Sequence, residues 1–224
     1  MKLRTIALLL YGHPRELAVP FSFETRSLCN YVQRHARSLK IETTGFNQIV
    51  IEDDLFKKAE TTPRLVPEKT LAVPFRVDVS RYQRATPDEK QNYFVEILGF
   101  GLQRANEFQA LPLHDLLLKV EEFKLNGFRN QWIHQTKSIR SHGLVAELQC
   151  ELTMEEFTLT LEVRRKMGPP VRLPILSTKP DELCFHYKFK DIAVREDYLV
   201  VTNRMYSNDE LVRFPLSRFL TLED

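Results

Sequence analysis

Hydrophobic and polar residues alternate along the C-terminal half of the chain. From residue 129 onward, apolar side chains recur at every second position, most clearly at 144–152 and 157–163. This is the spacing of a strand with one buried face. The segment 153–156 predicts a hairpin loop, and further strands are expected at 183–189, 192–194, 198–201 and 211–216. Together these runs predict an antiparallel meander with one face on a core and one in water.

The N-terminal part mixes strand and helix periods. Strands are predicted at 3–11, 46–52 and 70–79, and a helix over 22–40 with Ser22 as its N-cap. The polar segment 53–68, which contains two prolines, predicts a loop. Pro74 places the third strand at a sheet edge or a bulge, because proline cannot donate a ladder hydrogen bond.

Two helices are predicted in the centre of the chain. The first opens with Thr86-Pro87-Asp88-Glu89, which combines a threonine N-cap, a proline at the first helical position and a glutamate that closes a capping box. Gly99 and Gly101 lie inside it, where each costs about 1 kcal/mol relative to alanine. We therefore expect a closely packed neighbour to compensate. The second helix spans 113–125 and ends before an Asn-Gly pair.

These elements predict an α+β fold in three parts. A mixed α/β segment over 1–80 precedes a helical pair over 86–126 and an antiparallel sheet over 129–220. The two central helices are expected to pack on the apolar face of the C-terminal sheet. No long flexible linker separates the parts, so a single domain over 1–224 is predicted.

Composition narrows the choice of partner and compartment. The 32 basic and 30 acidic residues nearly cancel, which leaves no global field for nucleic acid or an anionic membrane. No apolar run is long enough to span a membrane, and the run 6–11 is too short for a secretory signal. Three widely spaced cysteines predict reduced thiols and a cytoplasmic location.

Motifs for catalysis or cofactor binding are not found. Gly99-Phe100-Gly101 lies inside a predicted helix, so it fits no phosphate-binding loop. There is no G-x-S-x-G, and the six histidines form no H-x-H or H-E-x-x-H pattern. We therefore predict no catalytic residue, no metal ligand and no cofactor.

Four residues are candidates for a binding surface. The single Trp132 stands at the start of the predicted sheet, where it would anchor a partner or pack at the margin of the core. His134 follows on the same segment. His186 and Lys188 share the polar face of the strand predicted at 183–189, together with Cys184.

The layout resembles the small immunity proteins that bacteria pair with secreted toxins. The passages that carry the resemblance are 86–98, TPDEKQNYFVEIL, and 181–191, DELCFHYKFKD. The resemblance implies a compact α+β domain that is not an enzyme and that binds and blocks a cognate toxin. It carries over no individual functional residue.

Two other functions remain open at this stage. A hydrolase or transferase site could assemble only in three dimensions, with His134, His142 and His186 as its candidates, and would require a deep pocket. A nucleic-acid-associated regulator would use Arg164-Arg165-Lys166 and the basic and aromatic residues near 185–190. Neither the partner nor the oligomeric state is predicted.

Overall fold

The computed structural model describes residues 1–57, 61–205 and 209–220. The chain folds into two compact units, Met1–Asn130 and Gln131–Asp224. The boundary lies close to residue 129, where the sequence period changes. Whether 1–224 behaves as the single domain that we expect depends on folding cooperativity and stays a prediction.

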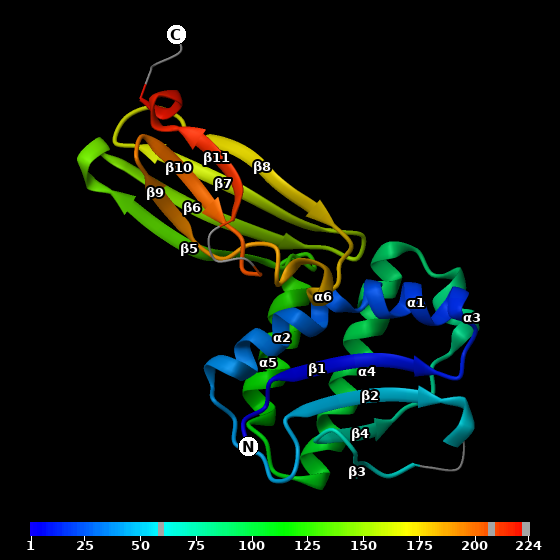
Figure 1. Ribbon diagram of the computed structural model, residues 1–224. Coiled ribbons are helices and arrows are strands. Elements are labelled where there is room, and N and C mark those ends of the chain that lie inside the picture. The colour runs from blue at the N-terminus through cyan, green and yellow to red at the C-terminus, as the bar shows by residue number, and fades with distance from the viewer. Residues whose placement is uncertain (58–60, 206–208, 221–224) are drawn as a thin grey trace. The chain divides into compact units, whose positions relative to one another are not determined.

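The first unit is a mixed sheet with helices (Figure 1). Its sheet has the order β1-β2-β4-β3, in which β1, β2 and β4 are parallel and β3 pairs antiparallel with β4. The elements in chain order are β1 (Thr5–Tyr11), α1 (Arg15–Glu24), α2 (Arg26–Ser38), β2 (Gln48–Asp54), the 3₁₀ turn η1 (Leu55–Lys57), β3 (Arg64–Val66), β4 (Thr70–Pro74), α3 (Val79–Arg84), α4 (Pro87–Phe108) and α5 (Leu113–Leu125).

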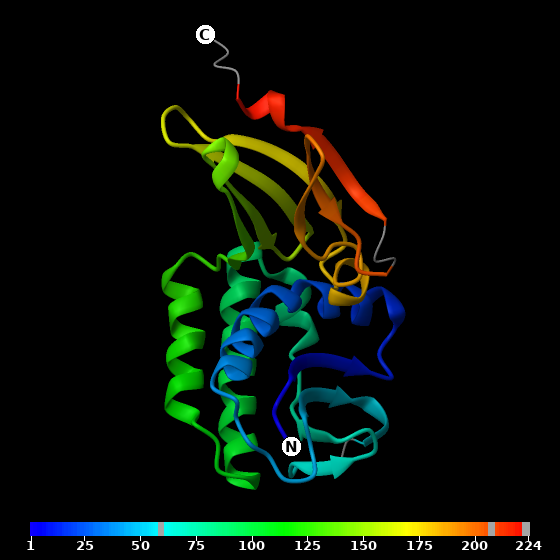
Figure 2. The same cartoon turned by 60° about the vertical axis from the view of Figure 1, so that its left-hand side comes forward.

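Helices α2, α4 and α5 lie together on one side of this sheet (Figure 2). The capping box predicted for α4 is confirmed: the Thr86 side chain accepts from the Glu89 N–H, and the Glu89 carboxylate accepts from the Thr86 N–H. A Cβ added to Gly101 would lie 2.1 Å from Cδ1 of Ile51 on β2. The closely packed neighbour expected for the helix glycines is therefore present at Gly101, and it is the central strand β2.

The second unit packs two antiparallel sheets around one core. The first sheet has the order β5-β6-β7-β8, and the second is the meander β11-β10-β9. Phe157, Leu159 and Leu161 of β7 are fully buried between them. The elements are β5 (Gln131–Ile139), η2 (Arg140–His142), β6 (Leu144–Leu152), β7 (Phe157–Arg165), β8 (Val171–Thr178), α6 (Glu182–Phe185), β9 (Ile192–Arg195), β10 (Tyr198–Thr202), β11 (Glu210–Pro215) and η3 (Leu216–Phe219).

The α+β class and the C-terminal antiparallel meander are confirmed. The packing of the central helices differs from the expectation. Helix α4 contacts β2 and β4, and α5 contacts α4 and α2, all inside the first unit. The C-terminal sheet buries its apolar face against β9, β10 and η3, which supply Ile192, Leu199, Val201 and Phe219 to the same core. An apolar face can be covered equally well by helices or by a second sheet, and the sequence period does not choose between them.

Several boundaries in the first unit also differ. The helix expected over 22–40 begins earlier and consists of α1 and α2, so Ser22 lies inside α1 and is not an N-cap. The strand expected over 70–79 ends at Pro74, and α3 begins at Val79. The segment 53–68, predicted as a loop, contains the end of β2, η1 and the whole of β3; its residues 58–60 lie outside the described residues.

The strand expected at 183–189 is wrong. Asp181 caps the short helix α6 by accepting from the Leu183 N–H, and a turn follows. Phe185 and Phe189, four residues apart, both stack on Phe157, at centroid distances of 3.8 and 5.7 Å. Leu183 and Tyr187 are 75% and 49% exposed. In a run with apolar residues at every second position, some of these residues are also four positions apart. The spacing in this segment is therefore compatible with a helical turn as well as with a strand.

Candidate functional site

The outer face of the β5–β8 sheet carries an ordered array of polar side chains. Alternate residues of β6 and β7 enter the core, so the intervening ones face outward. The strand register sets the outward residues in cross-strand rows. The three rows that matter for the site are Gln131, Glu151 and Thr158; Ile133, Gln149 and Thr160; and Thr136, Glu147, Glu162 and Arg172.

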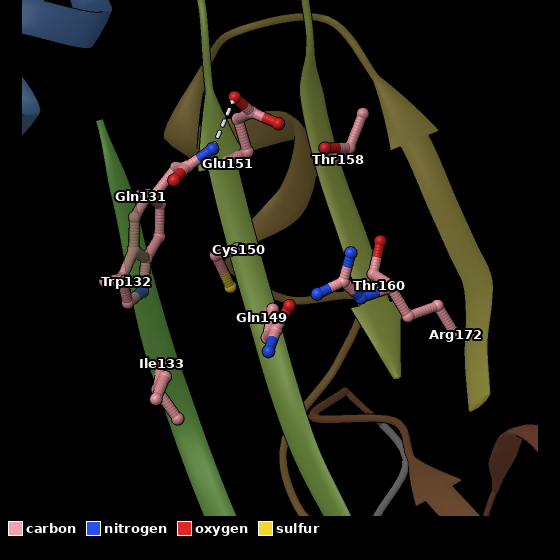
Figure 3. A pocket seen from close by; sticks show the side chains of 9 residues that line it. All are labelled: Gln131, Trp132, Ile133, Gln149, Cys150, Glu151, Thr158, Thr160 and Arg172. Atoms are coloured by element: carbon pink, nitrogen blue, oxygen red, sulfur yellow. Dashed lines mark hydrogen bonds between the residues drawn. The ribbon is translucent and has the colours of Figure 1, made fainter. Parts of the chain in front are cut away.

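A shallow hollow of about 550 Å³ lies over this face (Figure 3). Gln131 closes one end by donating to Oε1 of Glu151 at 2.9 Å. Thr158 and Thr160 project from β7, and Gln149 projects from β6 between them and Ile133. The lining residues are Gln131, Trp132, Ile133, Gln149, Cys150, Glu151, Thr158, Thr160 and Arg172.

Two carboxylates are buried on this outward face. Glu147 and Glu162 are only 7% and 3% exposed, and the register places them directly opposite each other. Arg164 joins them, because its Nη2 donates to Glu147 and its Nε donates to Oε1 of Glu162 at 2.6 Å. The hydrogen bond from Arg164 is the main reason that the pKa of Glu162 lies below its ordinary value, and Arg172 adds to the effect. Glu162 is therefore ionised at neutral pH.

Arg172 extends the network toward the hollow. Its Nε donates to Oε2 of Glu162 at 2.6 Å, while its side chain is 68% exposed. Figure 3 shows the side chain reaching from β8 past Thr160 in the direction of Gln149. A single buried carboxylate thus orients two arginines on an open surface.

The side chains of this array are suited to hydrogen-bonded recognition of a partner. Its polar side chains are amides, hydroxyls, carboxylates and a fixed guanidinium, which recognise hydrogen-bonding partners. The nine residues that line the hollow include no histidine, and the one cysteine among them, Cys150, is buried in the core. Since the hollow is shallow and open, it fits a protruding side chain better than an enclosed small molecule.

Of the four predicted binding residues, the structure places only Trp132 at this hollow. Its ring packs against the core, 6.0 Å from the Phe157 ring centroid, as expected for a tryptophan at a core margin. His134 is close to the carbonyl of Lys190, with 2.8 Å from Nε2 to the oxygen, and its ring meets Phe189 edge-on. It therefore links β5 to the segment before β9.

His186 and Lys188 do not share a strand face, because no strand forms there. His186 follows α6, with its Nε2 2.8 Å from Nη1 of Arg204, and Lys188 is exposed in the following turn. Cys184 lies in α6 and is half-buried. His142 lies in η2 beside Ser141. The three histidines proposed for an enzyme site are thus absent from the lining of this hollow.

Sequence reasoning missed Gln149, Thr160 and Arg172. Gln149 and Thr160 were recognised only as outward positions of half-buried strands. Arg172 was missed because β8 was not predicted: Pro169, Pro170 and Pro174 argue against a strand, and β8 is an edge strand, where proline is tolerated. The useful signal was the run of branched apolar residues around 171–176.

Across the described ranges, no helix has both the length and the apolar character to cross a membrane. No three histidine, cysteine or acidic side chains gather as metal ligands among the residues described. No family model, no curated protein and no solved structure matches this chain.

Proposed function

We propose that this chain is a non-enzymatic protein-binding module whose outer β5–β8 face docks one partner protein. The observation that carries the proposal is the Glu147–Arg164–Glu162–Arg172 network, in which two buried carboxylates hold two exposed guanidiniums on an open sheet face. Ionised side chains are costly to bury unless they are paired. Here the pairing holds the guanidiniums in place in advance, which lowers the entropy lost when a partner is bound.

The rest of the face supports the same proposal. Ile133 is an apolar side chain that is 54% exposed beside amides and hydroxyls. A small apolar contact surrounded by polar groups is the usual composition of a non-obligate interface. The hollow between Gln131 and Arg172 offers a place for a protruding side chain of the partner.

The more specific form of the proposal is an inhibitor that neutralises a cognate toxin in the cytoplasm. It rests on the resemblance to immunity proteins, which bind without catalysis. A preformed face suits such an inhibitor, because most inhibitor complexes form with little movement of the interface backbone. The toxin would be held by direct contact with the β5–β8 face.

Co-purification with paired variants tests the proposal. The tagged full chain is co-expressed with the product of the adjacent gene, and the captured complex is measured for stoichiometry and for the partner's activity. Ile133→Asp changes the proposed face. Leu118→Asp is a matched control, because Leu118 on α5 is also 54% exposed and does not line the hollow.

We expect wild type and Leu118→Asp to capture a stoichiometric, inactivated partner, and Ile133→Asp to lose it. Circular dichroism and thermal unfolding must show that both variants remain folded. Equal capture by all three proteins would exclude the β5–β8 face. Turnover of a substrate by the purified chain would overturn the non-enzymatic proposal.

A further inference from the structure

The free end of the Arg172 guanidinium defines a specific site within the hollow. Its Nε is taken by Glu162, at 2.6 Å. Among the described residues, its Nη1 and Nη2 have no protein partner. Two parallel N–H groups at the end of a guanidinium match the two oxygens of a carboxylate.

Neighbouring side chains complete a set of donors around this guanidinium. The hydroxyls of Thr158 and Thr160 have no hydrogen bond to other described residues, and both line the hollow. Gln149 contacts Glu147 only through a long 3.5 Å interaction from its Nε2, so its amide can turn toward a ligand. Figure 3 shows Thr160 on β7, the strand beside that of Arg172, and Gln149 on β6, one strand further.

Charge on this face favours a local carboxylate contact over a phosphate backbone. The network of two glutamates and two arginines has no net charge, so it provides no extended field for a phosphate backbone. Glu151 lies in the row at the other end of the hollow, about 13 Å from the Arg172 row at 3.3 Å per residue. An acidic group of a ligand should therefore bind at the Arg172 end of the hollow, and a hydrogen-bond donor of the ligand at the Glu151 end.

We infer that the hollow is a carboxylate-recognition site, in which Arg172 binds an aspartate or glutamate side chain of the partner protein and Gln149 and Thr160 add hydrogen bonds. This inference rests on the proposed function and names the chemistry of the partner. Glu162 is a positioning residue, since it orients Arg172 without touching the ligand.

The probes are a capped octaglutamate peptide and a capped octaglutamine peptide, titrated into the isotope-labelled full chain. Amide and side-chain NMR signals report the site. Arg172→Gln removes the two-nitrogen fork, and Arg172→Lys keeps the charge without it. Arg140→Gln is the control, because Arg140 is also exposed in the second unit but does not line the hollow.

We expect octaglutamate to shift the signals of Gln149, Thr160 and Arg172 saturably in wild type and in Arg140→Gln. Loss of the fork should weaken binding by about tenfold or more in both Arg172 variants. Octaglutamine should leave these signals in place. Unchanged affinity in Arg172→Gln would overturn the inference, as would binding of an octauridylate in place of the peptide.

The co-purification experiment separates this inference from the proposed function. Capture that survives Arg172→Gln but is lost in Ile133→Asp would keep the binding face and reject carboxylate recognition. Loss of capture in both variants, together with the octaglutamate shifts, would support the proposed binding face and carboxylate recognition.

Discussion

Glu147 and Glu162 face each other across the β6–β7 pairing, and the guanidinium of Arg164 bridges their carboxylates. Like charges directly opposite in a sheet repel, and burial increases the penalty. The bridging arginine removes this repulsion and fixes both acids. The arrangement of the charged side chains on the outer face therefore depends on the half-exposed Arg164, and substitution of Arg164 tests this dependence.

Removal of the bridging arginine should destabilise the protein in a pH-dependent manner. In Arg164→Gln, the two buried carboxylates have lost their shared counter-charge, so we expect a lower urea midpoint at pH 7 than in wild type. Protonation of a carboxylate near pH 4 relieves the repulsion, so the difference should shrink there. Arg140→Gln is the control and should follow wild type at both pH values. A difference that stays constant with pH would show that Arg164 acts through packing alone.

Glu162 should contribute to acid sensitivity of the wild-type protein. Its pKa is lowered in the folded state, chiefly by the hydrogen bond from Arg164. A lowered folded pKa stabilises the fold above the unfolded value, about 4.3, and this contribution is lost as the pH falls through the lower folded value. In Glu162→Gln we expect a shallower loss of stability below about pH 4, measured by urea unfolding from pH 5 to 2. Parallel curves for the two proteins would contradict this assignment.

The two glycines of α4 should respond to alanine with opposite signs. A Cβ at Gly101 would lie 2.1 Å from Ile51, so Gly101→Ala should destabilise the fold by about 1–3 kcal/mol through overpacking. At Gly99 the nearest atom is Cδ2 of Leu117 at 3.9 Å, an ordinary contact. Gly99→Ala should therefore stabilise the helix by up to about 1 kcal/mol. Chemical denaturation of both variants checks the pair, and destabilisation by Gly99→Ala would reveal a constraint beyond helix propensity.

Tyr82 should stabilise the first unit through its hydroxyl. This phenol is buried and donates to Oε2 of Glu24 at 2.8 Å, and Lys90 pairs with the same carboxylate. Loss of the hydroxyl in Tyr82→Phe should lower the free energy of unfolding by about 1 kcal/mol. Tyr187→Phe, at a 49% exposed tyrosine, should have little effect.

The same tyrosine should make the fold sensitive to alkali. Burial, followed by the hydrogen bond to Glu24, raises the pKa of Tyr82 above its ordinary value. A raised folded pKa stabilises the fold below the unfolded value, about 10, and the stability declines as the pH rises above it. Urea unfolding between pH 9 and 11 should show a smaller decline in Tyr82→Phe. Equal declines would assign the alkaline sensitivity to other groups.

Local signals in the sequence were sufficient for the elements that are stabilised locally. The capping box of α4 and the hairpin between β6 and β7 were predictable, because each depends on residues a few positions apart. The segment 183–189 was not, because its two phenylalanines satisfy a strand and a helical turn alike. Only stacking on Phe157, far away in the sequence, decides between them.

The candidate site was the least predictable part of the protein. Alternation along β6 and β7 indicated which residues face outward, including Gln149 and Thr160. It did not indicate that Glu147 and Glu162 are opposite each other or that Arg172 pairs with Glu162 from an unpredicted edge strand.

The sequence by itself determined most of the element types, the outward and inward faces of most strands, and the absence of recognisable catalytic motifs. The tertiary structure decided which surfaces pack together: α4 covers β2 and β4, and the β5–β8 sheet packs on β9 and β10. Periodicity reports that a face is apolar, which follows from the local chain geometry. The identity of its neighbour, and the register that brings charged side chains together, depend on contacts between residues distant in the sequence.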